Sequence, residues 1–294
     1  MSQDASLTRS ECLIRYRKSI NLSFELFLFN LWQLLQVAAY AQKDAEKKNA
    51  KLMPSEADMK FTARLYENPL VQSILLHQQF LGLVSTFEFK EKTDIDIIRR
   101  LYYDFAKTDI YLRYLDNTEA STEDHRQVLL QLYKFCISEE LFTDKIEDFY
   151  PTWTDDRSLI IGSMKKALKA LPADAEYLTA YRPTEETTKD FGEYLLTSVL
   201  DKDQEYLDII EPTLKNWDAD RVAIIDMILL KMALAELMGF PTIPTKVTLN
   251  EFVEISKLYS TDKSKDFING ILDRLLKKLD KDGKINKEGR GLIE

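Results

Sequence analysis

Residues 216–276 read NWDADRVAIIDMILLKMALAELMGFPTIPTKVTLNEFVEISKLYSTDKSKDFINGILDRLL, and their pattern says more about the fold than any other part of the chain. The stretch from Val222 to Met238 is apolar around most of its circumference and is interrupted only by Asp226, Lys231 and Glu236. A helix of this kind is buried on nearly all sides. A membrane span is disfavoured, because each ionisable residue would cost about 2.5–3.5 kcal/mol at the bilayer centre. The stretch is therefore predicted to be a central core helix.

The residues that follow carry the start and stop signals of two further helices. Gly239 is predicted to cap the end of the core helix, since Pro241 and Pro244 prevent its continuation. Thr248 and Glu251 have the spacing of a capping box, which predicts the start of a second helix. A third helix is predicted to be capped by Ser260 or Thr261 and to carry an inward stripe of Phe267, Ile268, Ile271, Leu272 and Leu275. Within it, Gly270 is expected to let a neighbouring helix approach closely.

Composition extends this helical interpretation to the whole chain. The 294 residues are 45% hydrophobic and include only 8 glycines and 8 prolines, and no run has the two-residue period of a strand. An all-α fold is predicted. Proline and asparagine residues separate helices that we expect near residues 10–50, 55–66, 69–89, 94–116, 122–149, 156–171 and 184–203.

The opening segment has two interpretations. Arg15, Arg17 and Lys18 precede an apolar run from Ile20 to Ala41, as in a secretory signal peptide. Glu25, Asn30, Gln33 and Gln36 interrupt that run, however, and fit the less buried side of an amphipathic helix. The second interpretation is preferred. The two cysteines, Cys12 and Cys136, lack metal-ligand spacing and indicate packing residues in a reducing cytoplasm.

No catalytic or metal site is predicted. His77 and His125 are the only histidines, and neither lies in a metal-binding spacing. The chain contains no phosphate-binding glycine loop and no nucleophile elbow. We therefore expect no enzyme activity, no cofactor and no metal.

Charge is unevenly distributed along the chain. The net charge is −9, which argues against a protein that binds nucleic acid alone by neutralising phosphates. From Lys231 onward there are 12 basic and 10 acidic residues, against 28 basic and 39 acidic before it. The pattern suits a protein that touches RNA with one side and a basic partner with the other, although a chance imbalance is the alternative.

Four motifs in the opening stretch carry a family resemblance. They are Trp217-Asp218-x-Asp220-Arg221, Ile243-Pro244-x-Lys246-Val247, Asn250-Glu251 and Phe267-x-Asn269-Gly270-x-Leu272-Asp273. Their order and spacing resemble the C-terminal half of the NusB family of bacterial transcription antitermination factors. The preceding part is similar to the extended form of NusB. We accordingly expect an N-terminal helical region at 1–183, a NusB-like helical bundle at 184–280 and a mobile tail at 281–294.

The resemblance implies a binding function. NusB proteins pair with NusE, a small-subunit ribosomal protein, and the pair binds the single-stranded boxA element of nascent RNA. Through this binding the pair acts indirectly on the elongating RNA polymerase. The positions that match the RNA-facing surface are Tyr206 for stacking, Thr242 for a polar contact and Lys246 for phosphate neutralisation. Tyr206 packing in the core is the alternative.

The same resemblance implies a surface that binds the protein partner and a group of residues that stabilise the bundle. Asp208, Glu211, Asp218 and Asp220 would face the basic ribosomal protein. The strongest matches are interpreted as residues that hold the bundle together by satisfying buried groups: Trp217, Arg221, Asn250, Glu251, Asn269 and Gly270.

One departure from the family pattern leaves a second function open. NusB proteins begin with an arginine-rich helix that grips RNA, and here Met1 to Lys18 stands in its place with Arg9, Arg15, Arg17 and Lys18 out of pattern. The alternative is thus a NusE-type protein-interaction module that has lost RNA binding. A homodimer that masks the RNA face is a third possibility, and no membrane association is expected.

Overall fold

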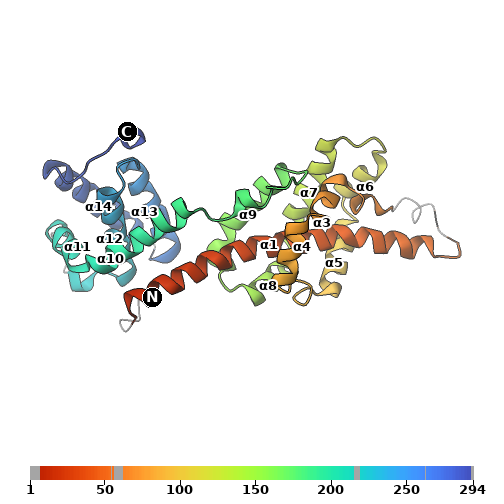
Figure 1. Cartoon of the computed structure of the whole chain (residues 1–294), viewed down its shortest axis with the longest axis horizontal. Helices are drawn as coiled ribbons and strands as arrows, with labels where there is room; N and C mark the ends of the chain where they lie inside the picture. Colours follow the sequence, from red (N-terminus) through yellow and green to blue (C-terminus); the bar gives the residue numbers. More distant parts are fainter. Residues whose placement is uncertain (1–6, 54, 56–61, 215–218, 262, 293–294) are drawn as a thin grey trace. The chain divides into compact units, whose positions relative to one another are not determined.

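The computed structural model describes residues 7–53, 55, 62–214, 219–261 and 263–292, and these residues contain helices and no strand. The prediction of an all-α fold is confirmed (Figure 1). Contacts divide the chain into two compact units. The bundle unit comprises Met1–Lys18 and Thr184–Glu294, and the middle unit comprises Ser19–Pro183.

Helix α1, Arg9–Asn49, contributes to both units, since its residues up to Lys18 belong to the bundle unit and those from Ser19 to the middle unit. The sequence had grouped residues 1–183 together. A 41-residue helix with one continuous pattern contains no local signal that its first turns pack against a segment some 170 positions away. The bundle unit is therefore built from two separate stretches of sequence.

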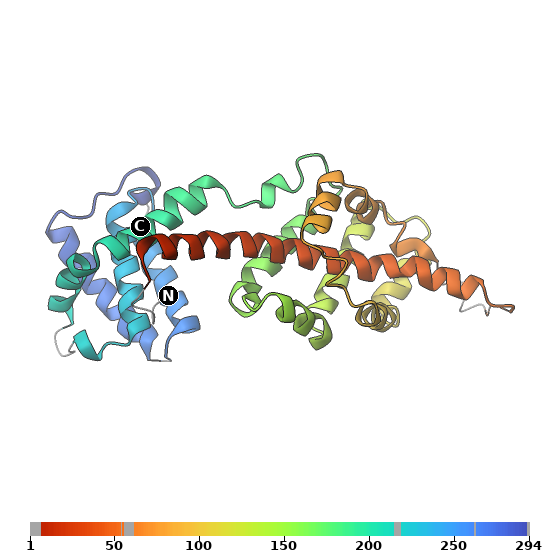
Figure 2. The same ribbon diagram turned by 60° about the horizontal axis from the view of Figure 1, so that its bottom comes forward.

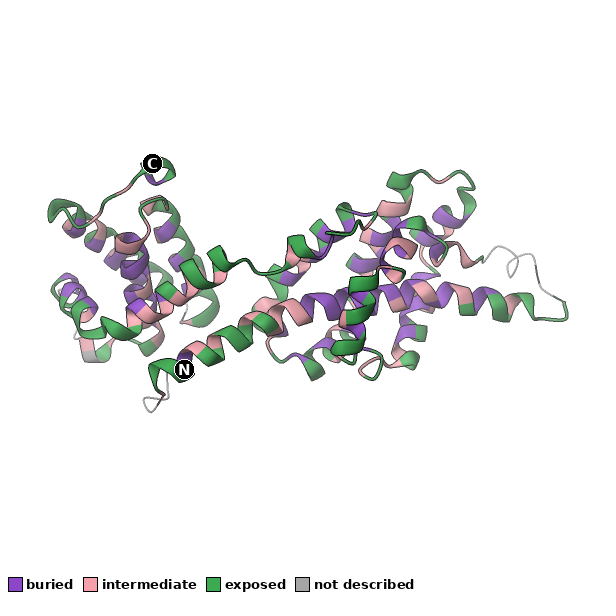
Figure 3. Cartoon of the chain, in the orientation of Figure 1, coloured by how far each residue is buried: buried purple, intermediate pink, exposed green. Residues whose placement is uncertain are grey.

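The middle unit packs its remaining helices around the apolar part of α1 (Figure 2). Their bounds are η1 Ala63–Leu65, α3 Pro69–Leu75, α4 Gln78–Thr86, α5 Ile95–Phe105, α6 Asp109–Asp116, α7 Thr122–Cys136, α8 Glu140–Phe149, α9 Trp153–Lys169 and η2 Thr179–Tyr181. One window of α1 is long and apolar enough to cross a membrane, but 67% of that window is buried inside the structure. Its apolar residues form core in this fold, as the purple segment of the helix in Figure 3 shows.

Two polar residues of α1 lie inside the core rather than on its less buried side. Asn30 is fully buried and donates to the Leu26 carbonyl at 3.1 Å, while the Tyr133 hydroxyl lies 3.5 Å from its side-chain oxygen. Gln33 is also buried and donates to the Thr93 hydroxyl at 3.3 Å. These hydrogen bonds offset the cost of removing the amides from water. The expectation that both side chains lie on the solvated side was wrong.

Three of the long predicted helices are each broken in two. The 69–89 segment breaks at Leu76 and His77, the 94–116 segment before Asp109, and the 122–149 segment between Cys136 and Glu140. At two of the breaks a side chain starts the new helix: His77 Nδ1 accepts from the Phe80 amide, and the Thr108 hydroxyl accepts from the Tyr111 amide, both at 3.3 Å. A capping side chain satisfies an amide that would otherwise lack an intrahelical partner. Half of the predicted 55–66 helix, residues 56–61, lies outside the described residues, and its described part contains the 3-10 helix η1.

The bundle unit is arranged around α12, Ile224–Gly239, which the sequence predicted as the core helix. The other elements are the π-helix η3 Glu186–Glu193, α10 Tyr194–Asp201, α11 Asp203–Ile210, η4 Glu211–Thr213, η5 Ala219–Arg221, α13 Thr245–Tyr259, α14 Ser264–Lys281 and η6 Gly289–Leu292. Leu230, Ala233 and Leu234 of α12 are fully buried. The predicted stripe of α14 is also buried at Ile268, Ile271, Leu272 and Leu275, whereas Phe267 is half-buried.

The predicted caps of these helices were wrong in detail. Gly239 is the last residue of α12 and does not have a left-handed backbone; its missing Cβ instead makes room for the Tyr194 ring, whose nearest atom would lie 2.5 Å away. Helix α13 begins at Thr245 after Pro244, so Thr248 lies inside the helix, fully buried. Helix α14 begins at Ser264, and Thr261 and Ser264 bond to each other through their hydroxyls.

The first turns of α1 dock onto the π-helix through a close contact at Gly192. The Tyr16 hydroxyl donates to the Thr188 carbonyl at 2.9 Å and occupies the space of a residue-192 Cβ. Arg9 bonds to Asp201 and Arg17 to Glu193, while Cys12 is buried. Because both ion pairs are exposed, they add little stability. The tyrosine contact is therefore the more specific part of the docking.

Replacing Gly192 by alanine should loosen this docking. A Cβ would lie 1.8 Å from the Tyr16 hydroxyl, so the ring must rotate away and give up its hydrogen bond, at a cost of about 1 kcal/mol. Tyr16→Phe should cost a similar amount, because it removes the same bond. Urea denaturation would measure the loss, and amide exchange should rise in the first turns of α1.

Gly162→Ala in α9 is the matched control, since nothing lies within 4 Å of the added Cβ. It should be neutral or stabilising by up to about 1 kcal/mol. Equal stability of Gly192→Ala, Tyr16→Phe and the wild-type chain would contradict the proposed contact.

Candidate functional site

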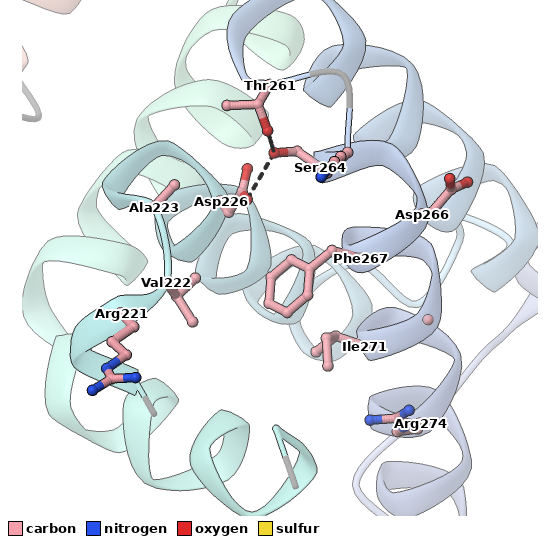
Figure 4. Close-up of a pocket in the computed structure, with 12 residues that line it drawn as sticks. Arg221, Val222, Ala223, Asp226, Thr261, Ser264, Asp266, Phe267, Ile271 and Arg274 are labelled. Carbon is pink, nitrogen blue, oxygen red and sulfur yellow. Dashed lines mark hydrogen bonds between the residues drawn. The ribbon is translucent and has the colours of Figure 1, made fainter. Parts of the chain in front are cut away.

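A pocket of about 470 Å³ opens in the bundle unit between the start of α12 and the first turns of α14. Phe267 and Ile271 project from α14 toward Val222 at the entrance to α12 (Figure 4). Asp226 and Ser264 lie at one end of the pocket, and Arg221 and Arg274 lie toward the other. Apolar side chains thus form the middle of the pocket and polar side chains its ends.

Asp226 holds the two walls of the pocket together. It is 5% exposed and accepts hydrogen bonds from the Ser260 hydroxyl at 2.5 Å and the Ser264 hydroxyl at 2.9 Å. Because both carboxylate oxygens accept hydrogen bonds, the group joins α12 to the end of α13 and to the start of α14, and its role is structural. It is poorly placed to act as a base or a ligand.

Among the lining residues that the structure describes, the remaining charges are mostly positive. Arg221, Lys263 and Arg274 line the pocket with one further described carboxylate, Asp266, and Figure 4 shows Asp266 directed away from Phe267. Arg274 also donates to the Thr213 carbonyl at 3.1 Å, which fixes its position. Within the described residues, no cluster of histidine, cysteine and carboxylate side chains could hold a metal ion. The arrangement suits binding of a flat, anionic ligand better than acid–base chemistry.

The three predicted RNA-binding residues lie in different environments. Thr242 is exposed in the loop between α12 and α13, and Lys246 is exposed in the first turn of α13. Tyr206 is only 2% exposed, and its hydroxyl hydrogen-bonds with that of Ser198 at 2.6 Å. A base cannot stack on a ring that is enclosed by its own core, so the stacking role expected for Tyr206 is corrected to a packing role.

The predicted partner surface is described in part. Asp208 is exposed at the end of α11 and accepts from Gln204 at 2.8 Å, and Glu211 is exposed one turn later. Asp218 and the side chain of Asp220 lie outside the described residues. Further exposed carboxylates lie nearby in sequence at Glu185, Glu186, Asp190 and Glu205. Residues 184–211 therefore form an acidic part of the bundle unit.

The residues interpreted as holding the bundle together are described except for Trp217. Arg221, Asn250, Glu251 and Asn269 are all exposed, so these four side chains lie at the surface rather than among buried groups. Gly270 has nothing within 4 Å of the position of a Cβ, so no helix approaches it closely. Arg221 and Gly270 instead line the pocket. These expectations are corrected: the motif residues that are described lie at the surface.

Sequence reasoning missed Phe267, Lys263 and Arg274 as candidate binding residues. Phe267 carried no signal in the sequence, because adjacent apolar residues of α14 such as Ile271 and Leu272 are both buried in the same core. The two cations carried no signal either, because single basic residues on a helix are usually solvated.

Gly270→Ala should stabilise the protein, contrary to the role expected from sequence. The added methyl group meets open space at the pocket, and alanine is favoured over glycine inside a helix by about 1 kcal/mol. The midpoint of urea unfolding should rise. A fall in that midpoint would mean that a neighbouring group does occupy this space.

Comparison with known proteins shows that the part of the chain that contains the pocket is similar to a known family. A family model described as the NusB family matches residues 159–277. The chain is 45% identical over 107 residues to the transcription antitermination protein NusB of Salinibacter ruber, a match that covers 36% of this chain and 67% of that protein.

Two further relatives carry the same name. The protein of Chloroherpeton thalassium is 42% identical over 106 residues, 36% of this chain and 50% of its own length. That of Natranaerobius thermophilus is 44% identical over 84 residues, 29% of this chain and 58% of its own length. The matches thus span about half to two thirds of the relatives. No solved structure matches the chain.

Proposed function

The chain belongs to the NusB family, and from this premise we propose that it is a transcription antitermination factor that acts in the cytoplasm with NusE on boxA-type single-stranded RNA. Its role is to bind and present RNA, with an indirect effect on the elongating polymerase. The observation that carries the proposal is the pocket, which the half-buried Phe267 ring lines together with Arg221, Lys263 and Arg274. No bond is made or broken in this proposal.

Single-stranded RNA is recognised by the combination that the pocket offers. Aromatic rings stack on splayed bases, and cationic side chains follow the phosphates. Phe267 supplies the ring in place of Tyr206, and Lys246 with Thr242 supplies contacts on the α12–α13 loop. Residues 221–292 carry 13 basic and 10 acidic side chains, which favours this part of the bundle unit for an anionic ligand.

The first turns of α1 support RNA binding as well. The chain was expected to lack the family's arginine-rich opening helix, yet Met1–Lys18 belongs to the same compact unit as the pocket. Arg9 and Arg17 are engaged with Asp201 and Glu193, whereas Arg15 and Lys18 are exposed. These two residues are the cations of this segment that we expect to reach phosphates.

The acidic residues 184–211 favour a basic protein partner. Exposed carboxylates such as Asp208 and Glu211 would speed association with a basic ribosomal protein more than they tighten it. If RNA binding has been lost, this surface supports the second candidate function, a NusE-type interaction module. We expect no cofactor, metal or membrane in either case.

Fluorescence anisotropy with a labelled boxA-type RNA tests the first function. Binding should strengthen when NusE is added and should weaken about 5- to 160-fold in Phe267→Leu, because stacking contributes about 1–3 kcal/mol per base. Leucine keeps the apolar volume and so protects the fold. Lys246→Glu should weaken binding and reduce the dependence of affinity on salt by about one phosphate contact.

Lys107→Glu is the matched control, since it makes the same change of charge on an exposed helix terminus of the middle unit. It should leave affinity within about twofold. Absence of RNA binding by the wild-type chain, with and without NusE, would refute this function.

A pull-down with NusE separates the two candidates. A double variant, Asp208→Lys with Glu211→Lys, should retain less NusE and show a slower association rate, because it reverses charge on the acidic surface. NusE retention without any RNA binding would favour the interaction module. Loss of both interactions in the wild-type chain would reject both candidates.

A further inference from the structure

The C-terminal segment from Lys284 to Leu292 folds back onto the α12–α13 loop. The turn after α14 uses Gly283, whose φ is +62°, and the Lys284 amide donates to the Leu279 carbonyl at 2.9 Å while the Gly283 amide donates to that of Asp280 at 3.0 Å. This is a Schellman motif, which reverses the chain at a helix end. Ile285 then packs against the core of the bundle unit. The sequence predicted a mobile tail here, whereas the structure ties the segment down.

Lys287 anchors the segment at the end of α12. Its ammonium group donates to the Phe240 carbonyl at 2.9 Å, where the helix ends. A cation at this place interacts favourably with the helix dipole. Burial lowers the pKa of Lys287, and attraction to the Glu236 carboxyl partly opposes that effect. Glu236 is itself 6% exposed, and burial raises its pKa, with Thr248 and Lys287 acting in the other direction.

Two backbone contacts fix the segment against the loop itself. The Glu288 amide donates to the Pro241 carbonyl at 2.9 Å. Gly291 is buried, and a Cβ there would lie 1.9 Å from that same carbonyl oxygen. Because the obstacle is backbone, it cannot move aside as a flexible side chain can. Residues 284–292 therefore hold the loop that contains Thr242, and we call this segment the clasp.

The clasp also brings basic residues to the loop. Residues 281–292 contain four basic and two acidic side chains. Lys284 and Arg290 are exposed, as are Thr242 in the loop and Lys246 just after it. The segment lies beyond residues 159–277 that match the family model.

We propose that the clasp is part of the RNA-binding surface: it orders the α12–α13 loop before RNA arrives, and Lys284 and Arg290 contact the RNA backbone. The inference rests on the proposed function and deepens it by assigning a second, C-terminal set of phosphate contacts. Pre-ordering raises affinity because less conformational freedom is lost on binding. Each phosphate contact adds to the dependence of affinity on salt.

Gly291→Ala and Arg290→Glu separate the two parts of the proposal in the full-length chain. Gly291→Ala should release the segment, so amide exchange across residues 241–246 rises and affinity for boxA-type RNA falls about 3- to 10-fold. Arg290→Glu should leave exchange unchanged, weaken binding a few-fold and lower the slope of log affinity against log salt by about 0.7. Anisotropy titrations at several salt concentrations measure both.

Gly82→Ala, with nothing within 4 Å of its added Cβ, and Lys107→Glu in the middle unit are the matched controls. If the wild-type chain binds RNA and neither test variant differs from its control in affinity, the clasp is purely structural and the inference is overturned. If the wild-type chain binds no RNA, the proposed function fails, and the inference fails with it.

Discussion

The bundle unit depends on the burial of α12, a helix that is apolar on nearly all sides yet carries three ionisable side chains. Leaving any of them buried and unpaired would be costly, so each must meet a partner on a surrounding element. Asp226 accepts from Ser260 at the end of α13 and from Ser264 at the start of α14, and Lys231 bonds to Asp203 at the start of α11. Glu236 is attracted by the Lys287 ammonium group of the C-terminal segment. The polar interruptions of the core helix thus determine where four neighbouring segments are attached to it.

This constraint also places the candidate binding surface. Asp226 joins the elements that enclose the pocket, and Glu236 and Lys287 lie where α12 gives way to the loop that holds Thr242. Side chains from other elements therefore fix the structure at both ends of α12. Binding residues that are fixed by such packing keep their geometry better than residues on an unsupported loop. Lys231 attaches α11 to α12 through Asp203. The exposed residues of α11 include carboxylates, whose negative charge is opposite to that of the cations at the pocket. A mildly basic stretch, residues 221–292, and an acidic stretch, residues 184–211, on one scaffold suit a protein that joins RNA to a basic partner.

Much of the fold could be predicted from local pattern, and much of the site could not. The length and apolarity of α12 and the stripe of α14 were evident, because burial imposes a period of 3.6 residues on any helix. The breaks within three long predicted helices were missed, since they depend on capping side chains such as His77 and Thr108, whose hydrogen bonds sequence does not reveal. Long-range pairing was invisible for the same reason: nothing near Tyr16 indicates Gly192. The motif residues were recognised but misinterpreted, because a polar residue at a helical position can either satisfy a buried group or face solvent. Asn250, Glu251 and Asn269 face solvent.

We expect RNA to contact the surface that is organised around the two ends of α12. Ultraviolet cross-linking of a boxA-type RNA that contains 4-thiouridine, followed by mass spectrometry of the cross-linked peptides, tests this claim directly, because it requires no substitution and reports contacts on the native chain. Cross-links should fall at Phe267, within residues 241–246 and within residues 284–292. Cross-links confined to Ser19–Pro183, with none in these three places, would contradict the account.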